Sequence, residues 1–254
     1  MNTFLIAGQS YAGNAHDKRL SVRDRRIKSY DMKENQWVVA DDPQPQGGGY
    51  TVSPPGRDAE WGSIWPAFAD SIQPFFVDPI RLITTSIYSE PLSFWLATPT
   101  AIDKIATGSQ VAEGKAPILW QHGESDVIAK TSRATYVREF RELRSRVASR
   151  SGYNLTWILA LSTHHPTVYN DPAAENEIRA ALIESAKEPD CLPGPDTDQL
   201  KGSYRSPIGH SQHFSESGQY AAAQMWHDSV IRASKLGAPK RHRTESGEPA
   251  KIPN

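Results

Sequence analysis

The strongest constraint on the fold is the alternation, along the chain, of short apolar segments with longer amphipathic ones. Between residues 132 and 149, apolar side chains recur every three or four positions, which is typical of a helix with one buried face. The apolar segments are short and rich in β-branched residues, as in buried parallel strands. Strands are expected at residues 3–7, 80–85, 117–121 and 155–161, and further helices at about 65–72, 173–186 and 215–233. This alternation predicts an α/β fold in which helices cover both faces of a parallel sheet.

The segments between these elements predict the rest of the organisation. Residues 27–30 and 36–39 are separated by a polar stretch and are expected to form a hairpin after the first strand. Residues 41–56 are rich in proline and glycine, so we expect a long surface loop there. A chain of 254 residues fits one large domain. We therefore expect a single domain over residues 1–234, followed by a polar, disordered tail over residues 235–254.

Charge and cysteine content exclude several classes of protein. The chain has 28 basic and 29 acidic residues, a formal net charge of −1, which favours neither nucleic acid nor an anionic membrane as a partner. Small neutral molecules are the expected partners, and the oligomeric state stays open. Cys191 is the single cysteine, which excludes an internal disulfide. No apolar run approaches the roughly 20 residues that span a bilayer. With no secretory signal in the sequence, we expect a cytoplasmic protein, although a secreted protein without its leader would look the same.

A serine directly follows the first predicted strand, in the stretch Gly8-Gln9-Ser10. Ligands of parallel α/β sheets bind beyond the carboxyl ends of the strands. Gly8 allows the backbone to turn sharply there, and the Ser10 hydroxyl can then face solvent with backbone N–H groups nearby. That arrangement suits a nucleophile whose attack creates an oxyanion. The alternative is that Ser10 is only a helix N-cap, and this stretch alone leaves both interpretations open.

Two later stretches favour the nucleophile. One follows another predicted strand and therefore lies at the same sheet edge as Ser10, and the other precedes the last predicted helix and places His213 on a loop as a candidate base. The three stretches together are more specific than any one of them. The two later stretches read Trp120-Gln121-His122-Gly123-Glu124-Ser125-Asp126 and His210-Ser211-Gln212-His213-Phe214-Ser215-Glu216-Ser217-Gly218-Gln219.

In their order, the stretches GQS, HGESD and HF with a following glycine resemble the blocks of the SGNH-hydrolase superfamily. Within it, the chain resembles carbohydrate esterases similar to sialate O-acetylesterases, and the resemblance extends from Thr3 to about Val230. It implies a three-layer α/β/α sandwich with a parallel, flavodoxin-like central sheet. It also implies hydrolysis of an O-acyl ester, commonly an acetyl group on a sugar, without a metal or cofactor.

The resemblance also implies roles for individual residues. Ser10 would be the nucleophile and His213 the general base. The oxyanion would be held by the Ser10 N–H, by a backbone N–H of the second block and by a side chain of the third block. Glu124 and Asp126 are expected to hold their loop by accepting backbone hydrogen bonds. The residues implied to bind the oxyanion or substrate are Gln9, Thr84, Thr85, His122, Gly123 and Glu124.

The chain departs from the family pattern at several positions. Tyr11 stands where the family has asparagine, Ile83 and Thr84 where it has two glycines, and His122 where it has glutamine. His210 occupies the place of the aspartate that would orient the base, so no carboxylate stands there. Either His213 works with Ser10 as a dyad oriented by His210, or another carboxylate reaches the base. The candidates for that carboxylate are Asp196, Asp198 and Glu124.

These departures keep two other functions open. A relative that binds carbohydrate without catalysis would tolerate changed blocks, and an O-acyltransferase would use the same serine to acylate a sugar hydroxyl. Three tryptophans, Trp61, Trp65 and Trp95, either line a sugar platform or pack in the protein. His164 and His165 are interpreted as loop residues, because no acidic or cysteine residue stands at metal-ligand spacing from them.

Overall fold

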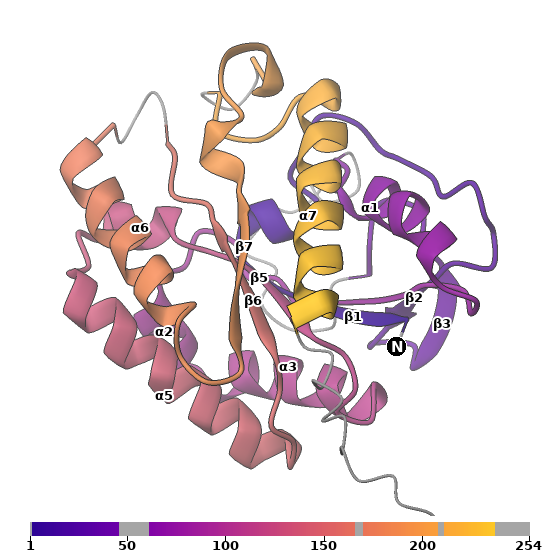
Figure 1. The fold of residues 1–254 in the computed structure, drawn as a ribbon, viewed down its shortest axis with the longest axis horizontal. Coiled ribbons are helices and arrows are strands. Elements are labelled where there is room, and N and C mark those ends of the chain that lie inside the picture. Colours follow the sequence, from indigo (N-terminus) through magenta and orange to yellow (C-terminus); the bar gives the residue numbers. More distant parts are fainter. Residues whose placement is uncertain (1, 46–60, 166–169, 208–210, 237–254) are drawn as a thin grey trace, which may run out of the picture.

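The computed structural model describes residues 2–45, 61–165, 170–207 and 211–236. The described chain forms a seven-stranded sheet in the order β3-β2-β4-β1-β5-β6-β7 (Figure 1). All strand pairs are parallel except β2 with β3. The predicted α/β class is therefore confirmed, and the sheet predicted to be parallel is parallel at every strand pair but one. The strands are β1 (Thr3–Gly8), β2 (Lys28–Asp31), β3 (Gln36–Val39), β4 (Arg81–Thr84), β5 (Ile118–Gln121), β6 (Trp157–Leu161) and β7 (Cys191–Asp196).

Six of the seven strands lie where the apolar segments predict them, including the hairpin of β2 and β3. The chain runs from β1 to one side of the sheet through β2 and β4 and then to the other side through β5, which leaves the carboxyl ends of β1 and β5 side by side. Strand β7 was not predicted, because Pro193, Gly194 and Pro195 interrupt its apolar pattern. It lies at the edge of the sheet, where a strand tolerates proline.

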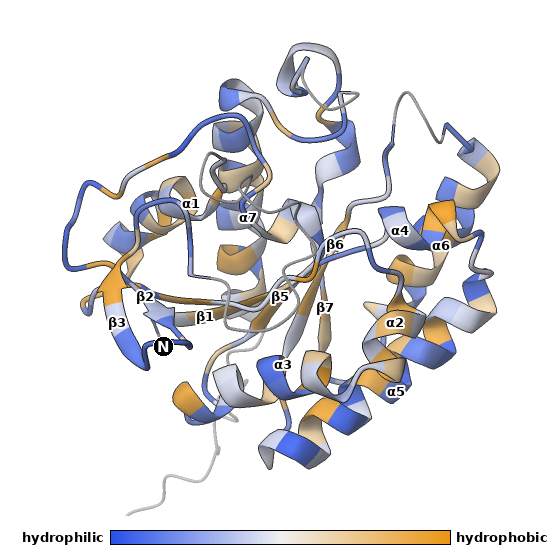
Figure 2. Ribbon diagram, turned by 180° about the vertical axis from the view of Figure 1, so that it is seen from behind, coloured by the Kyte–Doolittle hydropathy of each residue, from blue (hydrophilic) through white to orange (hydrophobic). Residues whose placement is uncertain are grey.

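Helices cover both faces of the sheet. Helices α2, α3, α5 and α6 pack on one face and α1 and α7 on the other (Figures 1 and 2). Four of the helices correspond to predicted segments, whereas α2, α3 and α4 were not predicted. The helices are α1 (Trp65–Ile72), α2 (Leu92–Ala97), α3 (Pro99–Val111), α4 (Glu124–Ile128), α5 (Arg133–Ser151), α6 (Pro172–Ser185) and α7 (Glu216–Leu236).

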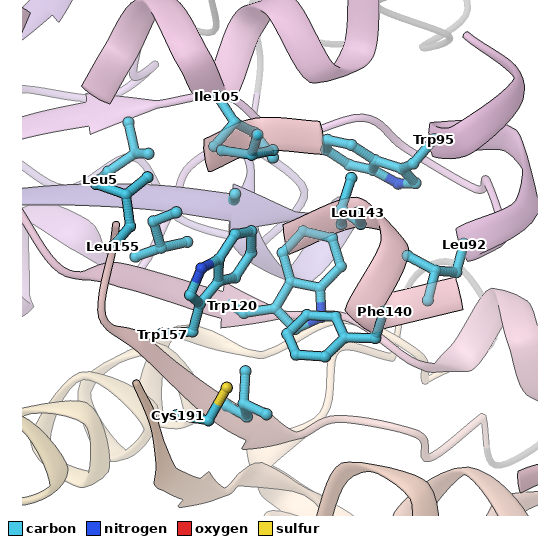
Figure 3. Close-up of a cluster of buried hydrophobic side chains, with 14 of the residues drawn as sticks. Leu5, Leu92, Trp95, Ile105, Trp120, Phe140, Leu143, Leu155, Trp157 and Cys191 are labelled. Atoms are coloured by element: carbon cyan, nitrogen blue, oxygen red, sulfur yellow. The ribbon is translucent and has the colours of Figure 1, made fainter. Parts of the chain in front are cut away.

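Alternating side chains of the central strand, β1, pack into two separate hydrophobic cores, one on each face of the sheet. Phe4 and Ile6 of β1 pack with α1 and α7, whereas Leu5 and Ala7 pack with the helices of the opposite face. The second of these cores is rich in tryptophan, with Trp120 and Trp157 from β5 and β6 (Figure 3). Because both faces are buried, a shift of one residue in register would exchange the two cores, and this fixes where each strand ends.

Several expectations fall wholly or partly on residues that the structure does not describe. Of the expected loop over residues 41–56, residues 46–56 lie outside the described residues. Helix α7 continues to Leu236, and the rest of the expected tail, residues 237–254, also lies outside them. Cys191 is buried and free. Within the described ranges, no helix combines the length and the apolar character needed to cross a bilayer.

Candidate active site

Strand β1 ends in a sharp turn that presents Ser10. Gly8 has φ 138°, and a Cβ atom there would lie 2.1 Å from the carbonyl oxygen of Gln121 in β5. Only glycine fits this position. The Gln9 N–H donates to the same carbonyl over 3.1 Å. Ser10 then begins the 3-10 turn η1 (Ser10–Ala12), and the first N–H groups of such a turn have no acceptor within it. The Ser10 N–H is therefore a donor beside its own hydroxyl.

The fold brings His213 to Ser10 across 203 residues of sequence. Its Nε2 atom lies 3.0 Å from Ser10 Oγ. Burial is the main reason why the pKa of His213 falls to about 3, and the positive charges of Arg205 and His165 lower it further. His213 is therefore neutral at physiological pH, and its Nε2 can accept the Ser10 proton.

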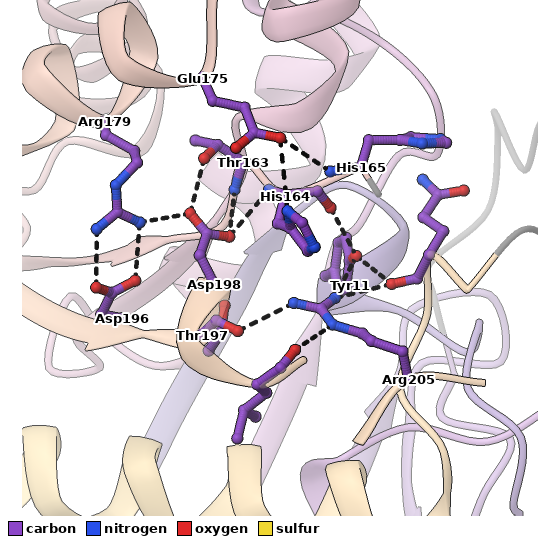
Figure 4. Close-up of polar contacts among 12 residues, drawn as sticks. Tyr11, Thr163, His164, His165, Glu175, Arg179, Asp196, Thr197, Asp198 and Arg205 are labelled. Atoms are coloured by element: carbon purple, nitrogen blue, oxygen red, sulfur yellow. Dashed lines mark hydrogen bonds and ion pairs between the residues drawn. The ribbon is translucent and has the colours of Figure 1, made fainter. Parts of the chain in front are cut away.

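A buried clamp fixes the main chain next to His213. Arg205 Nη1 donates to the Tyr11 hydroxyl over 2.5 Å and to the carbonyl of Gln212 over 2.8 Å, and the Tyr11 hydroxyl donates to the same carbonyl (Figure 4). Arg205 is only 5% exposed, and its Nη2 donates to the Thr197 carbonyl over 3.1 Å. Tyr11, which stands where the family has asparagine, thus joins the serine turn to the histidine loop.

His16 holds the same loop from its other side. Its Nδ1 accepts from the Phe214 N–H over 3.1 Å, and its Nε2 lies 3.2 Å from the Tyr11 carbonyl. Because Nδ1 accepts, the proton is on Nε2 and is donated to Tyr11. Burial is the main cause of a His16 pKa well below the usual value. The rings of Tyr11 and His16 lie 5.5 and 5.9 Å from the His213 ring, between centroids, so packing also restricts its rotation.

Trp61 is the one of the three candidate tryptophans that lies at this site. Its ring meets the His213 ring edge to face, with 5.9 Å between centroids, and it is partly exposed. Trp65 and Trp95 are fully buried, one in each core. Trp61 is therefore the candidate for contact with a substrate.

The group that orients His213 is not found among the candidate carboxylates. Within the described residues, His213 Nδ1 has no hydrogen-bond partner. Asp196 forms two hydrogen bonds with Arg179, and Asp198 accepts from Arg179 and from two backbone N–H groups of the loop after β6 (Figure 4). These contacts engage both carboxylates with partners other than His213. His210 lies outside the described residues, so its orienting role stays a prediction.

Glu124, the third candidate carboxylate, contacts the serine instead of the histidine. The Ser10 hydroxyl lies within donating distance of Glu124 Oε1, at 3.2 Å, and Gln212 Nε2 donates to the same oxygen over 2.7 Å. Glu124 is 1% exposed, and burial is the main cause of a pKa raised to about 8. Asp126, by contrast, accepts from the backbone N–H of Leu92 at the start of α2 over 3.0 Å and from the Thr131 hydroxyl over 2.7 Å, so its backbone bond reaches a neighbouring helix and not its own loop.

Gln9 and Gly123 bind each other. Gln9 Oε1 accepts from the Gly123 N–H over 3.0 Å and from the Ser125 N–H over 3.4 Å, which fixes the turn after β5. Gly123 has φ 154°, and a Cβ atom there would lie 3.0 Å from the Ser162 carbonyl oxygen. The Gly123 N–H is thus already bonded, and Gln9 acts through the position of the loop that carries Glu124.

His122 does not face Ser10. Its Nε2 lies 3.1 Å from the Glu90 carbonyl and its Nδ1 lies 3.3 Å from the Tyr136 hydroxyl, while its ring stacks on Trp120. Burial lowers its pKa to about 4. The expectation that this ring supplies an oxyanion donor disagrees with the geometry, because both nitrogens are bonded within the tryptophan-rich core.

Thr84 and Thr85 are also bonded elsewhere. The Thr85 N–H and hydroxyl both donate to the Ile6 carbonyl, over 2.8 and 3.0 Å, and the Thr84 hydroxyl donates to the Pro45 carbonyl. These bonds belong to the pairing of β1 with β4 and to the adjacent loop. The expected oxyanion donors at these two positions therefore disagree with the structure.

The sequence interpretation missed Tyr11, His16, Arg205 and Gln212 as parts of the site. Tyr11 and Gln212 each neighbour a residue of the candidate dyad, and that proximity is a usable signal. Arg205 lies in a segment with no motif, so no local pattern points to it.

His164 Nδ1 lies 3.5 Å from Glu175, and within the described ranges no group of three or more His, Cys, Asp or Glu side chains is placed to hold a metal.

No protein-family model and no curated protein matches this chain. Solved structures share its fold at low identity. A protein of Arabidopsis thaliana is 16% identical, with a TM-score of 0.64, over 93% of this chain and 98% of its own. A carbohydrate acetylesterase from Xanthomonas citri is 12% identical, with a TM-score of 0.57, over 92% of this chain and 56% of its own. The esterase EstA of Pseudoalteromonas is 13% identical, with a TM-score of 0.54, over 92% of this chain and 100% of its own. The chain thus has the α/β fold found in solved esterases and acetylesterases.

Proposed function

We propose that this protein is a serine esterase that removes an O-acetyl or other short acyl group from a carbohydrate or a related small ester. The observation that carries the proposal is the 3.0 Å contact between Ser10 Oγ and His213 Nε2 at the carboxyl edge of the sheet. A neutral histidine in hydrogen-bond contact with a serine hydroxyl is the arrangement that activates a serine nucleophile. The fold shared with solved esterases supports the same reaction class.

The reaction proceeds in two halves. In the first, His213 Nε2 takes the Ser10 proton while Oγ attacks the ester carbonyl, and the departing alcohol then takes that proton back. In the second, a water molecule gives a proton to His213 and attacks the acyl carbonyl; the bond to Oγ then breaks, and His213 returns the proton to Ser10 as the acid leaves. The oxyanion that forms in each half lies next to the Ser10 N–H at the start of η1.

The base is oriented through its neighbours in sequence. The carbonyl of Gln212 accepts from Tyr11 and Arg205, and the Phe214 N–H donates to His16. These bonds fix the main chain on both sides of His213. A dyad held in this way keeps its geometry without a carboxylate on Nδ1, although it lacks the negative charge that would stabilise the imidazolium.

The carbohydrate part of the proposal is supported by Trp61. A partly exposed indole beside the base offers an aromatic face on which a sugar ring can stack. The acetylesterase fold of the Xanthomonas citri protein and the balanced charge of this chain favour a neutral acetylated sugar. Acetylated sialates, which carry a carboxylate and are not neutral, are the second substrate class, suggested by the resemblance of the sequence blocks.

Acetate release from p-nitrophenyl acetate and from a panel of acetylated sugars tests the proposal. Release that is abolished in Ser10→Ala and unchanged by EDTA is the expected result. Sugar binding without acetate release would favour a binding protein instead, and transfer of the acetyl group to an added sugar acceptor would favour an acyltransferase.

A further inference from the structure

Two groups compete for one proton at the candidate nucleophile. Ser10 Oγ lies 3.0 Å from His213 Nε2 and 3.2 Å from Glu124 Oε1. A serine hydroxyl has a single proton to donate. Whichever acceptor is stronger therefore decides whether Ser10 is poised for transfer of its proton to the base.

The surroundings of Glu124 disfavour its ionised form. The side chain is 1% exposed, and Oε1 lies 3.2 Å from Ser10 Oγ and accepts a hydrogen bond from Gln212 Nε2. Across the described residues, Oε2 has no hydrogen-bond partner and no lysine or arginine forms an ion pair with this carboxyl. A buried carboxylate without a paired cation is costly, so the group retains its proton.

The charged and titratable groups facing Glu124 leave this conclusion intact. The polar side chains of Gln9, Gln212 and Ser10 favour ionisation, and Arg205, on the segment before α7, does so more weakly at longer range. Burial outweighs them all, and the pKa of Glu124 stands at about 8. Burial raises the pKa of Tyr11, in η1, well above 10, and burial lowers the pKa of His213 to about 3. Of these groups, Glu124 is therefore the one that changes charge between pH 6 and 9.

We propose that Glu124 is a further catalytic residue that works as the neutral carboxylic acid, so that the Ser10 hydroxyl donates to His213. This inference rests on the proposed function, because it assigns a role at the same nucleophile. A neutral carbonyl oxygen accepts only a weak hydrogen bond from Ser10. An ionised Glu124 would accept a charge-assisted bond roughly twice as strong and would hold the proton away from the base.

The proton balance of the step leaves Glu124 unchanged. The Ser10 proton passes to His213 Nε2, the bond from Oγ to the electrophile forms, and an electron pair moves onto the electrophile's oxygen. Glu124 keeps its proton throughout. Its negative charge, if present, would lie beside the oxyanion as it forms and would raise the barrier by like-charge repulsion.

The rate at which a small p-nitrophenyl alkylphosphonate labels Ser10 tests this inference without a known substrate. Attack by Oγ on phosphorus releases p-nitrophenolate, and intact mass confirms one label per chain. Ser10→Ala supplies the background at each pH. In the wild-type protein, the labelling rate at pH 9 should be about tenfold lower than at pH 7, since a group with a pKa of about 8 is largely neutral at the lower pH and largely ionised at the higher.

Glu124→Gln keeps the shape of the neutral acid and does not ionise. The ratio of its labelling rates at pH 9 and pH 7 should rise to about one, whatever its absolute rate. Glu113→Gln is the matched control, because Glu113 is exposed and pairs with Lys115 after α3, and it should keep the wild-type ratio. Asp126 and Lys104 have pKa values of about 7 and 8 and are unchanged in both variants.

Two results would overturn the inference. One is a wild-type labelling rate that does not fall between pH 7 and pH 9, which needs no variant to fold. The other is a fall that persists undiminished in Glu124→Gln. A wild-type Ser10 that is not labelled at any pH would instead refute the proposed function, and this inference with it.

Discussion

The hydroxyl of Tyr11 donates to the main-chain carbonyl of Gln212, the residue directly before His213. The two residues are 201 positions apart in sequence, and Arg205 donates to both of them. The serine turn and the histidine loop are thus held together by a bond next to the candidate dyad as well as by the dyad itself.

Tyr11→Phe should lower kcat about tenfold and leave KM nearly unchanged. The substitution removes one donor from the Gln212 carbonyl and one acceptor from buried Arg205, and an unsatisfied buried group costs about 1–3 kcal/mol. Steady-state kinetics on p-nitrophenyl acetate measure the effect. Tyr220→Phe is the control, because Tyr220 is 50% exposed on α7. An unchanged kcat in Tyr11→Phe would show that the clamp does not position the base.

Ser10→Ala, His213→Ala and the double variant should retain similar residual activity. Residues that act as a unit lose nearly as much singly as together, and these two share a 3.0 Å contact. Ser234→Ala, at the exposed end of α7, controls for loss of a serine hydroxyl. Additive losses in the double variant would contradict the dyad.

Glu124→Gln should alter how the free energy of unfolding depends on pH. The pKa of Glu124 is about 8 in the folded protein and near 4.3 in an unfolded chain, so the folded state binds an extra proton between these values. Stability from this group is complete at low pH and is lost as pH rises from about 5 to 8. Urea unfolding should therefore show the wild type losing up to about 1.4 kcal/mol per pH unit relative to the variant. Parallel stability curves for the two proteins would count against a neutral Glu124.

Trp61→Ala should raise KM for acetylated sugars about fivefold and leave hydrolysis of a small acyclic acetate ester unchanged. Stacking on an aromatic face contributes roughly 1 kcal/mol, and Trp61 is the partly exposed indole beside His213. Trp37→Ala removes a partly buried indole from β3 and serves as the control. Equal effects on both substrates would assign Trp61 to packing against the base.

His210→Asp should raise kcat and extend activity to lower pH if His213 works in a dyad oriented by His210. A carboxylate would stabilise the imidazolium, and unlike histidine it stays unprotonated near pH 6 to 7. The pH profile of kcat measures this. If His210→Asp leaves kcat unchanged while Asp196→Asn or Asp198→Asn abolishes activity, the orienting acid is one of those two residues.

The sequence by itself determined the fold class, six of the seven strands and the two residues of the candidate dyad. Strands such as β1 and β5 are short, continuous apolar runs because both of their faces are buried, and that local pattern can be read without neighbours. Strand β7 was not predicted, because Pro193 and Pro195 argue against a strand. A strand tolerates them at the edge of a sheet, and only the tertiary structure shows that β7 lies there. Helix α4 is five residues long, too short to show a period.

Tertiary structure decided which side chains of the candidate site contact one another. Glu124 and His122 are two residues apart in one motif, yet the first faces Ser10 and the second is buried against Trp120 and Tyr136. The order of residues assigns both to the same loop, but which side of the sheet each one reaches depends on the turn at Gly123 and on the core that the ring fills. Arg205 donates a hydrogen bond to Tyr11, 194 residues away in sequence, and no local sequence pattern predicts this contact. Contacts of this kind arise from packing between distant segments, so they cannot be predicted from composition or residue spacing.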